Sequence, residues 1–353
     1  MILMFFLTGA LLTAFTGIWG ADLAISAPPK PLVLRIGHFP NLTHAQALVA
    51  HGLSRQGKGW FEERLGPHVR IDWYVYNAGP SAMEALFADS LDLAYVGPSP
   101  TINAYIKSEG KEIRIVAGAC SGGAALVVQP HSELVTNQDF KGKKIGTPQL
   151  GNTQDIACRT WLRNNHFKIS LRGGDVLVIP TDNSDQLGLF QQRHLDAVWT
   201  VEPWVSRLEF EAGAKLYLEE STQWPQTQGK YVTAHLVSSA GFLKEHPEIL
   251  KKWIAAHVEL TQWIERHPEA AKQILNTELK KETMQPLPKD ILDRAWKRLE
   301  ITYDPIAPTL IKYAADAYAL GFFKAKPDLS SIYALHILNA VLKEKGLDEV
   351  QVK

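Results

Sequence analysis

The chain has 353 residues, of which 37 are Lys or Arg and 37 are Asp or Glu, so its formal net charge at neutral pH is zero. This balance argues against a nucleic-acid surface as the main function, because such a surface needs an excess of basic residues. Hydrophobic residues make up 46% and charged residues 21%, as in ordinary globular proteins. A single core rarely exceeds about 250–300 residues, so the length predicts two domains.

The first 27 residues predict export. Residues 2–19 are apolar with small side chains, and no charged residue occurs before Asp22. Such a run is typical of the hydrophobic part of a secretory signal peptide, which we predict over residues 1–27. An N-terminal membrane anchor is the alternative, because about 17 apolar residues reach the lower limit for crossing a bilayer and no Lys or Arg precedes them. Whether this segment is cleaved stays open.

The following residues predict strands and helices in alternation. An apolar strand is expected at 32–36, and Thr43 is the expected N-cap of the helix after it. Ser81 is expected to cap a later helix, because Glu84 follows at the spacing of a capping box. Further strands are expected at 69–76, 93–96 and 113–117, and a further helix from Pro98.

The same alternation continues in the middle of the chain and predicts parallel βαβ units. Strands are expected at 124–128, 144–147, 176–179, 197–200 and 230–238, and helices at 151–165, 186–193 and 203–212. From Gly241 onward we expect helices alone, packed on the first lobe of the fold. They are expected at 247–264, 268–275, 289–299, 305–318 and 331–345.

One sequence pattern occurs twice, over residues 77–99 and 180–204. Each copy is a polar turn, an amphipathic helix, a Leu-Asp pair, a short apolar strand and a polar turn that opens the next helix. Two copies predict two similar α/β lobes that face each other across a cleft. We expect the lobes to divide the chain into a first part of lobe 1 at 32–122, lobe 2 at 123–230, and a return to lobe 1 with C-terminal helices at 231–353.

Several polar residues lie where the predicted strands end and helices begin. Ligands of parallel α/β sheets bind at this edge, where helix N-termini present free N–H groups that suit a small anion. The residues of this kind are Thr43, His44, Ser81, Ser99, Asn152, Thr153 and Gln154, and Ser121 and Gly122 add a permissive turn. Each residue alone fits an ordinary capping role, so the prediction depends on their meeting at one edge.

The second copy ends on a carboxylate and an aromatic ring, Glu202 and Trp204. A carboxylate would repel an anion, so a structural role is favoured for Glu202. Trp204 fits packing on an alkyl part of a ligand or packing on a neighbouring helix equally well.

Metal-binding and catalytic motifs are weak or missing. His38, His44 and His51 invite a metal hypothesis, but no Cys or acidic cluster accompanies them in sequence, so we expect no metal and interpret His44 as a hydrogen-bond donor. No nucleophile motif, phosphate-binding loop or dinucleotide fingerprint occurs, which predicts neither a cofactor nor an enzyme. Cys120 and Cys158 are interpreted as buried small hydrophobes rather than as a disulfide, although sequence alone leaves their pairing open.

Four short motifs, GHFPNLTHAQAL at 37–48, VGPS at 96–99, PQLGNTQD at 148–155 and WTVEPW at 199–204, resemble one known family. They are similar to the periplasmic substrate-binding proteins of ABC importers for aliphatic sulfonates, taurine and nitrate, over about residues 32–270. The resemblance implies a type II periplasmic-binding fold, two α/β lobes with crossing hinge strands. It also implies a periplasmic monomer that binds a small organic oxyanion, such as an aliphatic sulfonate or a sulfate ester, and delivers it to an ABC permease in the inner membrane.

The resemblance also implies where the ligand is held. The implied contacts are Thr43, His44, Ser81, Gly97, Ser99, Ser121, Gly122, Asn152, Thr153 and Gln154, and Glu202 and Trp204 complete the expected site. No arginine stands out as its cation, and Arg159 is the one candidate. An enzyme of pyrimidine, thiamine-precursor or menaquinone metabolism on the same fold, or a binding protein for nitrate or a pyrimidine, are the alternatives.

Overall fold

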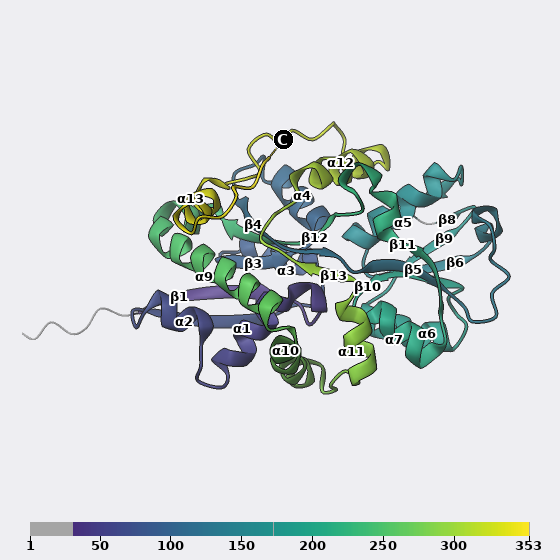
Figure 1. The fold of residues 1–353 in the computed structure, drawn as a ribbon. Coiled ribbons are helices and arrows are strands. Elements are labelled where there is room, and N and C mark those ends of the chain that lie inside the picture. Colours follow the sequence, from purple (N-terminus) through teal and green to yellow (C-terminus); the bar gives the residue numbers. More distant parts are fainter. Residues whose placement is uncertain (1–30, 172, 353) are drawn as a thin grey trace, which may run out of the picture. The chain divides into compact units, whose positions relative to one another are not determined.

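The computed structural model describes residues 31–171 and 173–352, and residues from 31 onward form one compact unit. The predicted signal peptide lies outside the described residues. Two β-sheets with helices around them build this unit, as Figure 1 shows. Among the described residues, no helix combines the length and the apolar character needed to cross a membrane.

The first sheet has six strands in the order β13-β4-β12-β3-β1-β2. β1, β2 and β3 are parallel, whereas β12 runs antiparallel to β3 and β4, and β13 is antiparallel to β4. The strands are β1 (Leu32–His38), β2 (Val69–Val75), β3 (Leu93–Val96), β4 (Ile113–Gly122), β12 (Val232–Ser239) and β13 (Leu299–Ile301).

The second sheet has five strands in the order β11-β5-β10-β6-β9. β6, β9 and β10 are parallel, and β5 is antiparallel to β10 and β11. Its strands are β5 (Ala124–Val128), β6 (Lys144–Thr147), β9 (Leu177–Pro180), β10 (Ala197–Val201) and β11 (Lys215–Glu219), and a small ladder joins β7 (Ile169–Ser170) to β8 (Gly173–Gly174).

The two sheets share one topology, in which β2-β1-β3-β12 corresponds to β9-β6-β10-β5. In each sheet an antiparallel strand lies beside the third parallel strand, and the chain reaches it from the other sheet. β5 follows β4 of the first sheet, and β12 follows β11 of the second sheet. The repeated sequence pattern therefore occupies equivalent places in the two sheets. The exact lobe boundaries stay a prediction.

The repeated Leu-Asp pair has the same structural role in both copies. Asp92 donates its N–H to the Arg35 carbonyl (2.9 Å) and accepts the Arg35 N–H on Oδ2 (2.7 Å). Asp196 does the same with Lys144, at 2.9 Å and 2.8 Å. Two hydrogen bonds between one pair of residues fix the start of β3 against β1, and the start of β10 against β6.

The leucine of each pair packs over a strand glycine. A Cβ placed on Gly37 of β1 would lie 2.7 Å from Cδ1 of Leu91, and one on Gly146 of β6 would lie 2.8 Å from Cδ1 of Leu195. Real Cβ atoms do not approach this closely. Each glycine is therefore needed because a side chain there would displace the buried leucine.

Short helices follow the strands of both sheets. They are the 3₁₀ turn η1 (Leu42–His44) and the helices α1 (Ala45–Ser54), α2 (Trp60–Leu65), α3 (Gly79–Phe87), α4 (Pro98–Lys107), α5 (Thr153–Asn164), α6 (Asn183–Gln191) and α7 (Trp204–Ala212). Two of the expected caps are wrong. Asn41 rather than Thr43 precedes η1, and Ala78 rather than Ser81 precedes α3, which begins at Gly79 and has Pro80, whose φ is already fixed, in its first turn.

The C-terminal third is mostly helical, as expected. It contains α8 (Ala240–Glu245), α9 (Pro247–Arg266), α10 (Pro268–Thr283), α11 (Lys289–Trp296), α12 (Ala307–Ala319) and α13 (His336–Glu344). Residues of α9, α10 and α13 share one hydrophobic core with the first sheet, and Trp253 of α9 stacks on Phe61 of α2 with ring centroids 3.7 Å apart. Residues of α11 belong to the same core, and residues of α12 belong to a second core of the first sheet. The two helices also contact α7 and α5, which flank the second sheet.

One expectation about this region is wrong, because β13 is a strand within the part expected to be purely helical. Its three residues pair with the far end of β4, from Gly122 to Cys120. A segment this short has no strand signal of its own, so it is ordered by the free edge that β4 offers.

Cys120 and Cys158 are both free and buried. Cys120 belongs to the core shared by the first sheet and the C-terminal helices, and Cys158 to a core of the second sheet. The interpretation of both as small hydrophobes is confirmed.

The Asp–strand contact is testable in the second sheet. Asp196→Ala removes the acceptor of the Lys144 N–H, so we expect the free energy of unfolding to fall by about 1–3 kcal/mol in urea denaturation. Asp348 is exposed, and Asp348→Ala should change the free energy of unfolding by less than about 0.5 kcal/mol. Equal effects of the two variants would show that the Leu-Asp pair does not fix the strand.

Candidate functional site

The two sheets meet where a strand of each ends. Gly97 follows β3 and Ser99 lies in the first turn of α4, and the turn after β6 leads into Thr153 at the start of α5. The Ser99 N–H lies 3.4 Å from Oγ1 of Thr153, and a Cβ placed on Gly97 would lie 2.7 Å from the same oxygen. Two predicted site residues of the first sheet and one of the second are therefore in direct contact.

The hydroxyl of Ser99 is unusual in this setting. Ser99 is 4% exposed, and its Oγ has no hydrogen-bond partner among the described residues. Burying an unpaired hydroxyl costs free energy, so native structures generally give such groups a partner. The orphan hydroxyl lies at the N-terminus of α4, beside the N-terminus of α5.

The start of α5 carries three predicted residues. Asn152 is the N-cap, and its side chain accepts the Thr153 N–H at 2.6 Å. Thr153 and Gln154 are buried. Two nitrogens of Arg159 are already bonded, because its Nε donates to Asp155 at 3.0 Å and its Nη1 donates to the Ser170 carbonyl at 3.0 Å, whereas its buried Nη2 has no partner among the described residues. Both Arg159 and Asp155 are buried, so this ion pair on α5 lies in the protein interior.

His44 is held as a neutral donor. Its Nδ1 accepts the Phe39 N–H at 3.3 Å, so the proton of the neutral ring is on Nε2. Burial, aided by the nearby His38, lowers the pKa of His44 to about 3. His44 therefore has an N–H group and no charge at any ordinary pH.

Thr43, Ser121 and Gly122 lie where the chain crosses from the first sheet to the second. A Cβ on Gly123 would lie 3.5 Å from Cγ2 of Thr43, so the two segments touch. Ser121 accepts the Tyr231 N–H on its Oγ (3.2 Å), and Gly122 donates its N–H to the Tyr231 carbonyl (3.1 Å). The φ angles of Gly122 and Gly123 are 81° and 85°. Residues with a side chain adopt such angles only with backbone strain, so both positions favour glycine.

Glu202 is buried and paired. Its carboxylate accepts hydrogen bonds from the N–H and hydroxyl of Ser206 (3.1 and 2.9 Å) and from Nη1 of Arg298 (2.9 Å). Burial raises the pKa of this carboxyl, and the Arg298 guanidinium opposes that rise. Arg298 also binds Glu209 and Glu219 of the second sheet and its helices. These contacts match the structural role favoured for Glu202.

Trp204 forms a second contact between the turns of the two sheets. Its indole N–H donates to Oδ1 of Asn41, which follows β1, at 3.3 Å. A cavity of about 360 Å³ opens beside this pair. It is lined by residues that follow β1, β2, β9 and β10 together with the end of α10, namely Pro40, Asn41, Asn77, Asp182, Asn183, Ser184, Leu187, Trp204, Arg207, Glu282, Thr283 and Gln285.

Arg207 is the cationic residue that the sequence reasoning missed. It lines this cavity, and its guanidinium lies 4.8 Å from the centre of the Trp204 ring. Glu211 already binds it through two hydrogen bonds, at 2.8 and 3.1 Å. The spacing of three residues from Trp204 on one helix was the available signal. Ser81, in contrast, is exposed on α3, and within the described part of the chain its side chain forms no hydrogen bond with the other predicted residues.

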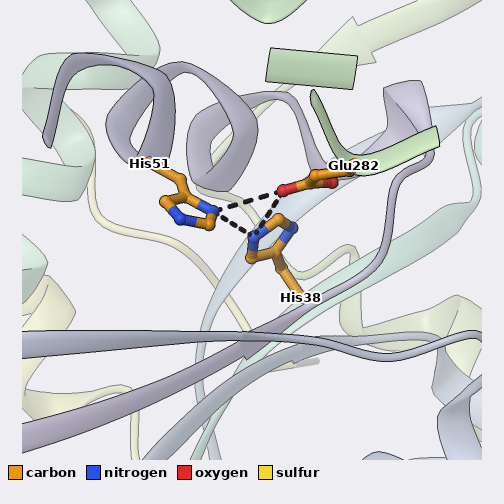
Figure 2. A group of neighbouring side chains, drawn as sticks. All are labelled: His38, His51 and Glu282. Carbon is orange, nitrogen blue, oxygen red and sulfur yellow. Dashed lines mark hydrogen bonds and ion pairs between the residues drawn. The ribbon is translucent and has the colours of Figure 1, made fainter. Parts of the chain in front are cut away.

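The structure brings two of the three suspected histidines together, but not His44. His38 and His51 lie 3.0 Å apart, and Glu282 of α10 lies beside both, as Figure 2 shows. Burial lowers the pKa of both imidazoles to about 4. The acidic partner comes from more than two hundred residues further along the chain, so no local spacing could have indicated it.

The comparisons with known proteins agree with this architecture. The NMT1-like family model matches residues 27–277, so the chain belongs to the NMT1-like family. A Bacillus subtilis (strain 168) protein named for binding aliphatic sulfonates is 24% identical over 83% of each chain. The taurine-binding periplasmic protein of Escherichia coli (strain K12) is 22% identical over 54% of this chain and 57% of its own.

Solved structures show the same fold. The alkanesulfonate-binding protein SsuA from Xanthomonas axonopodis pv. citri, bound to MOPS, has a TM-score of 0.67 and 20% identity, covering 87% of this chain and 99% of its own. The periplasmic nitrate-binding protein NrtA from Synechocystis PCC 6803 has a TM-score of 0.72 and 13% identity, covering 90% of both chains. The predicted type II periplasmic-binding fold is confirmed.

The contact at Gly97 is testable. Its φ of −71° and ψ of 161° suit alanine, so only the new Cβ would matter, and it would press on Thr153 across the two sheets. We expect Gly97→Ala to leave the melting temperature within a few degrees and to weaken ligand binding by about 10-fold or more, as overpacking does. Calorimetric titration with the ligand measures it.

Gly188 of α6 is the matched control, since a Cβ there meets no atom within 4 Å. Gly188→Ala should leave the affinity unchanged. Unchanged affinity in Gly97→Ala as well would show that the contact between the two turns is not part of ligand binding.

Proposed function

We propose that this protein is the solute-binding protein of an ABC importer and captures a small organic oxyanion between its two sheets. The ligand class is an aliphatic sulfonate, a sulfate ester or a similar anion. The observation that carries the proposal is the buried, unpaired hydroxyl of Ser99, located where the N-termini of α4 and α5 approach each other. A hydroxyl with this placement is ready to donate to an anion that both helix N-termini favour.

Neutral donors would carry the recognition. The three arginines near these turns are each paired with a carboxylate: Arg159 with Asp155, Arg207 with Glu211, and Arg298 with Glu202. His44 contributes an uncharged N–H. We therefore assign the oxyanion to hydroxyls, the His44 N–H and the helix N-termini, an arrangement typical of electrostatic stabilisation by fixed dipoles. Thr43, Ser121, Gly122, Asn152 and Gln154 stay proposed contacts of the same site.

The organic part of the ligand is assigned to the cavity beside Trp204. Its volume, about 360 Å³, falls within the usual range for small-molecule sites. The Trp204 ring supplies an apolar wall, and the amide side chains of Asn41, Asn77 and Asn183 supply polar groups around it.

We propose that the protein binds its ligand without catalysis, and two observations support this. Burial raises the pKa of both cysteine thiols, so neither is an activated nucleophile. The relatives named for aliphatic sulfonates and taurine are binding proteins. We propose a monomer exported to the periplasm by its signal peptide, with an ABC permease of the inner membrane as its partner.

Ser99→Ala tests the proposal through two opposite effects. Removing an unpaired buried hydroxyl should leave the ligand-free protein as stable as before, or more stable by about 1 kcal/mol, whereas losing a hydrogen bond to an anion should weaken binding by about 10-fold to 100-fold. Thermal shift without ligand and titration with ethanesulfonate measure the two effects.

Thr261 of α9 is the matched control, because it is equally buried but donates to the His257 carbonyl at 2.9 Å. Thr261→Ala should lower stability and leave affinity unchanged. If no alkanesulfonate, sulfate ester, nitrate or phosphonate at millimolar concentration stabilises the wild-type chain, the oxyanion proposal is wrong, since a ligand that binds the folded state must stabilise it.

Trp204 sets the response to ligand length. In wild-type protein, each added methylene should strengthen alkanesulfonate binding by up to about fourfold, the value for one buried CH₂ group. Trp204→Ala should flatten this series from methanesulfonate to butanesulfonate. Phe210 lies on the same helix and is 50% exposed, so Phe210→Ala should preserve it. An unchanged slope in Trp204→Ala would place the organic part elsewhere.

A further inference from the structure

We propose that His38, His51 and Glu282 form a binding site for a divalent transition-metal ion, and that zinc fits it best. The three residues come from the end of β1, the middle of α1 and the end of α10. Their ligand atoms point toward one another in Figure 2, and all lie within 4.8 Å. This site does not depend on the proposed transport function.

The triangle of ligand atoms has the dimensions that zinc requires. Nε2 of His38 lies 3.0 Å from Nδ1 of His51, and Oε1 of Glu282 lies 3.3 Å from the first nitrogen and 3.2 Å from the second. Tetrahedral zinc with ligands at about 2.0–2.1 Å holds neighbouring ligand atoms about 3.3 Å apart. One ion can therefore contact all three atoms with little movement of the side chains.

The hydrogen-bond pattern leaves lone pairs facing the centre of this triangle. Nδ1 of His38 lies 3.3 Å from the Phe39 carbonyl, an acceptor, so the ring proton is on Nδ1 and Nε2 presents a lone pair. Both oxygens of Glu282 are buried without a well-formed hydrogen bond within residues 31–352. With Glu282 ionised, the one proton available, on Nδ1 of His51, cannot satisfy all of these acceptors, whereas a cation would.

The surroundings hold the ligands in place, as metal sites require. Trp73 stacks on His51 with ring centroids 5.3 Å apart and meets His38 edge-on at 5.7 Å. Glu278 lies 3.4 Å from Nδ1 of His51 and is bound by Arg55 at 2.7 Å. The bond from His38 to the Phe39 carbonyl is the outer contact that fixes a metal-binding imidazole.

The ligand set selects the kind of ion. Two imidazole nitrogens and one carboxylate match zinc and its neighbours, whereas calcium and magnesium prefer sets of oxygen ligands. Three protein ligands leave one coordination position open in a tetrahedral site. Glu282 also lines the cavity beside Trp204, so a bound ion would lie next to the proposed ligand site.

The test uses the full chain without a polyhistidine tag, stripped with EDTA and dialysed against zinc. We expect one zinc per chain by mass spectrometry of the metal, a higher melting temperature with zinc but not with magnesium or calcium, and intense visible absorption when cobalt replaces zinc. Glu282→Gln and His51→Ala should each weaken zinc binding by at least about 10-fold. His68 is exposed, and His68→Ala should bind zinc as the wild type does.

Two results would overturn the proposal. The first is a wild-type chain that keeps no zinc after dialysis, or whose cobalt complex shows only the weak absorption of six-coordinate cobalt. The second is zinc binding that survives in Glu282→Gln and His51→Ala and is lost in His68→Ala, which would indicate a surface site. The cobalt spectrum of the wild-type chain decides the matter if a variant fails to fold. Failure of oxyanion binding, with zinc bound, would contradict the transport function alone.

Discussion

The two-bond contact between an aspartate and the neighbouring strand fixes the rest of this fold. β3 is only four residues long and β10 only five, so the position of each strand's first residue determines where its last residue lies. Asp92 and Asp196 fix that first residue against β1 and β6 through the same pair of hydrogen bonds, one between backbones and one to the carboxylate. At about 3.3 Å per residue, a slip of one position would move the turn at Gly97 away from Thr153 and reverse the faces of the strand.

Much of the fold follows from local sequence, and the residues show why. β3, β5 and β6 begin and end where expected, and β3 and β5 do so because each is a short apolar run between polar or small residues. β13 escapes such reasoning because its pairing partner, β4, is distant in the chain. The cap expected at Ser81 is wrong because α3 already begins at Gly79, with Pro80 in its first turn. Local sequence patterns therefore predict the positions of helices and strands well. They do not predict contacts between residues that are distant in the chain.

The site shows the same division. Gly97, Ser99 and Thr153 could be predicted, because strand ends of a parallel sheet share one edge. The residues that neutralise the charges of the site could not be predicted in this way. Arg298 neutralises Glu202 from the segment before β13, and Glu282 reaches His38 from α10. Charges buried in a protein must be paired or must bind an ion, and here each partner comes from the C-terminal third. That region therefore completes the electrostatics of turns that belong to the rest of the chain.

Arg298 has a mechanical consequence. Its carbonyl would lie 2.6 Å from a Cβ on Gly122, so this residue lies directly at the β4–β5 crossing between the two sheets. There its guanidinium binds three carboxylates of the second sheet and its helices, Glu202, Glu209 and Glu219. Arg298 therefore links the two sheets close to the point where the chain crosses between them. We infer that these ion pairs oppose sliding of one sheet along the other more than rotation about the crossing. An opening of the two sheets about this point would separate the Ser99–Thr153 and Asn41–Trp204 contacts, which lie at the turns that follow the strands.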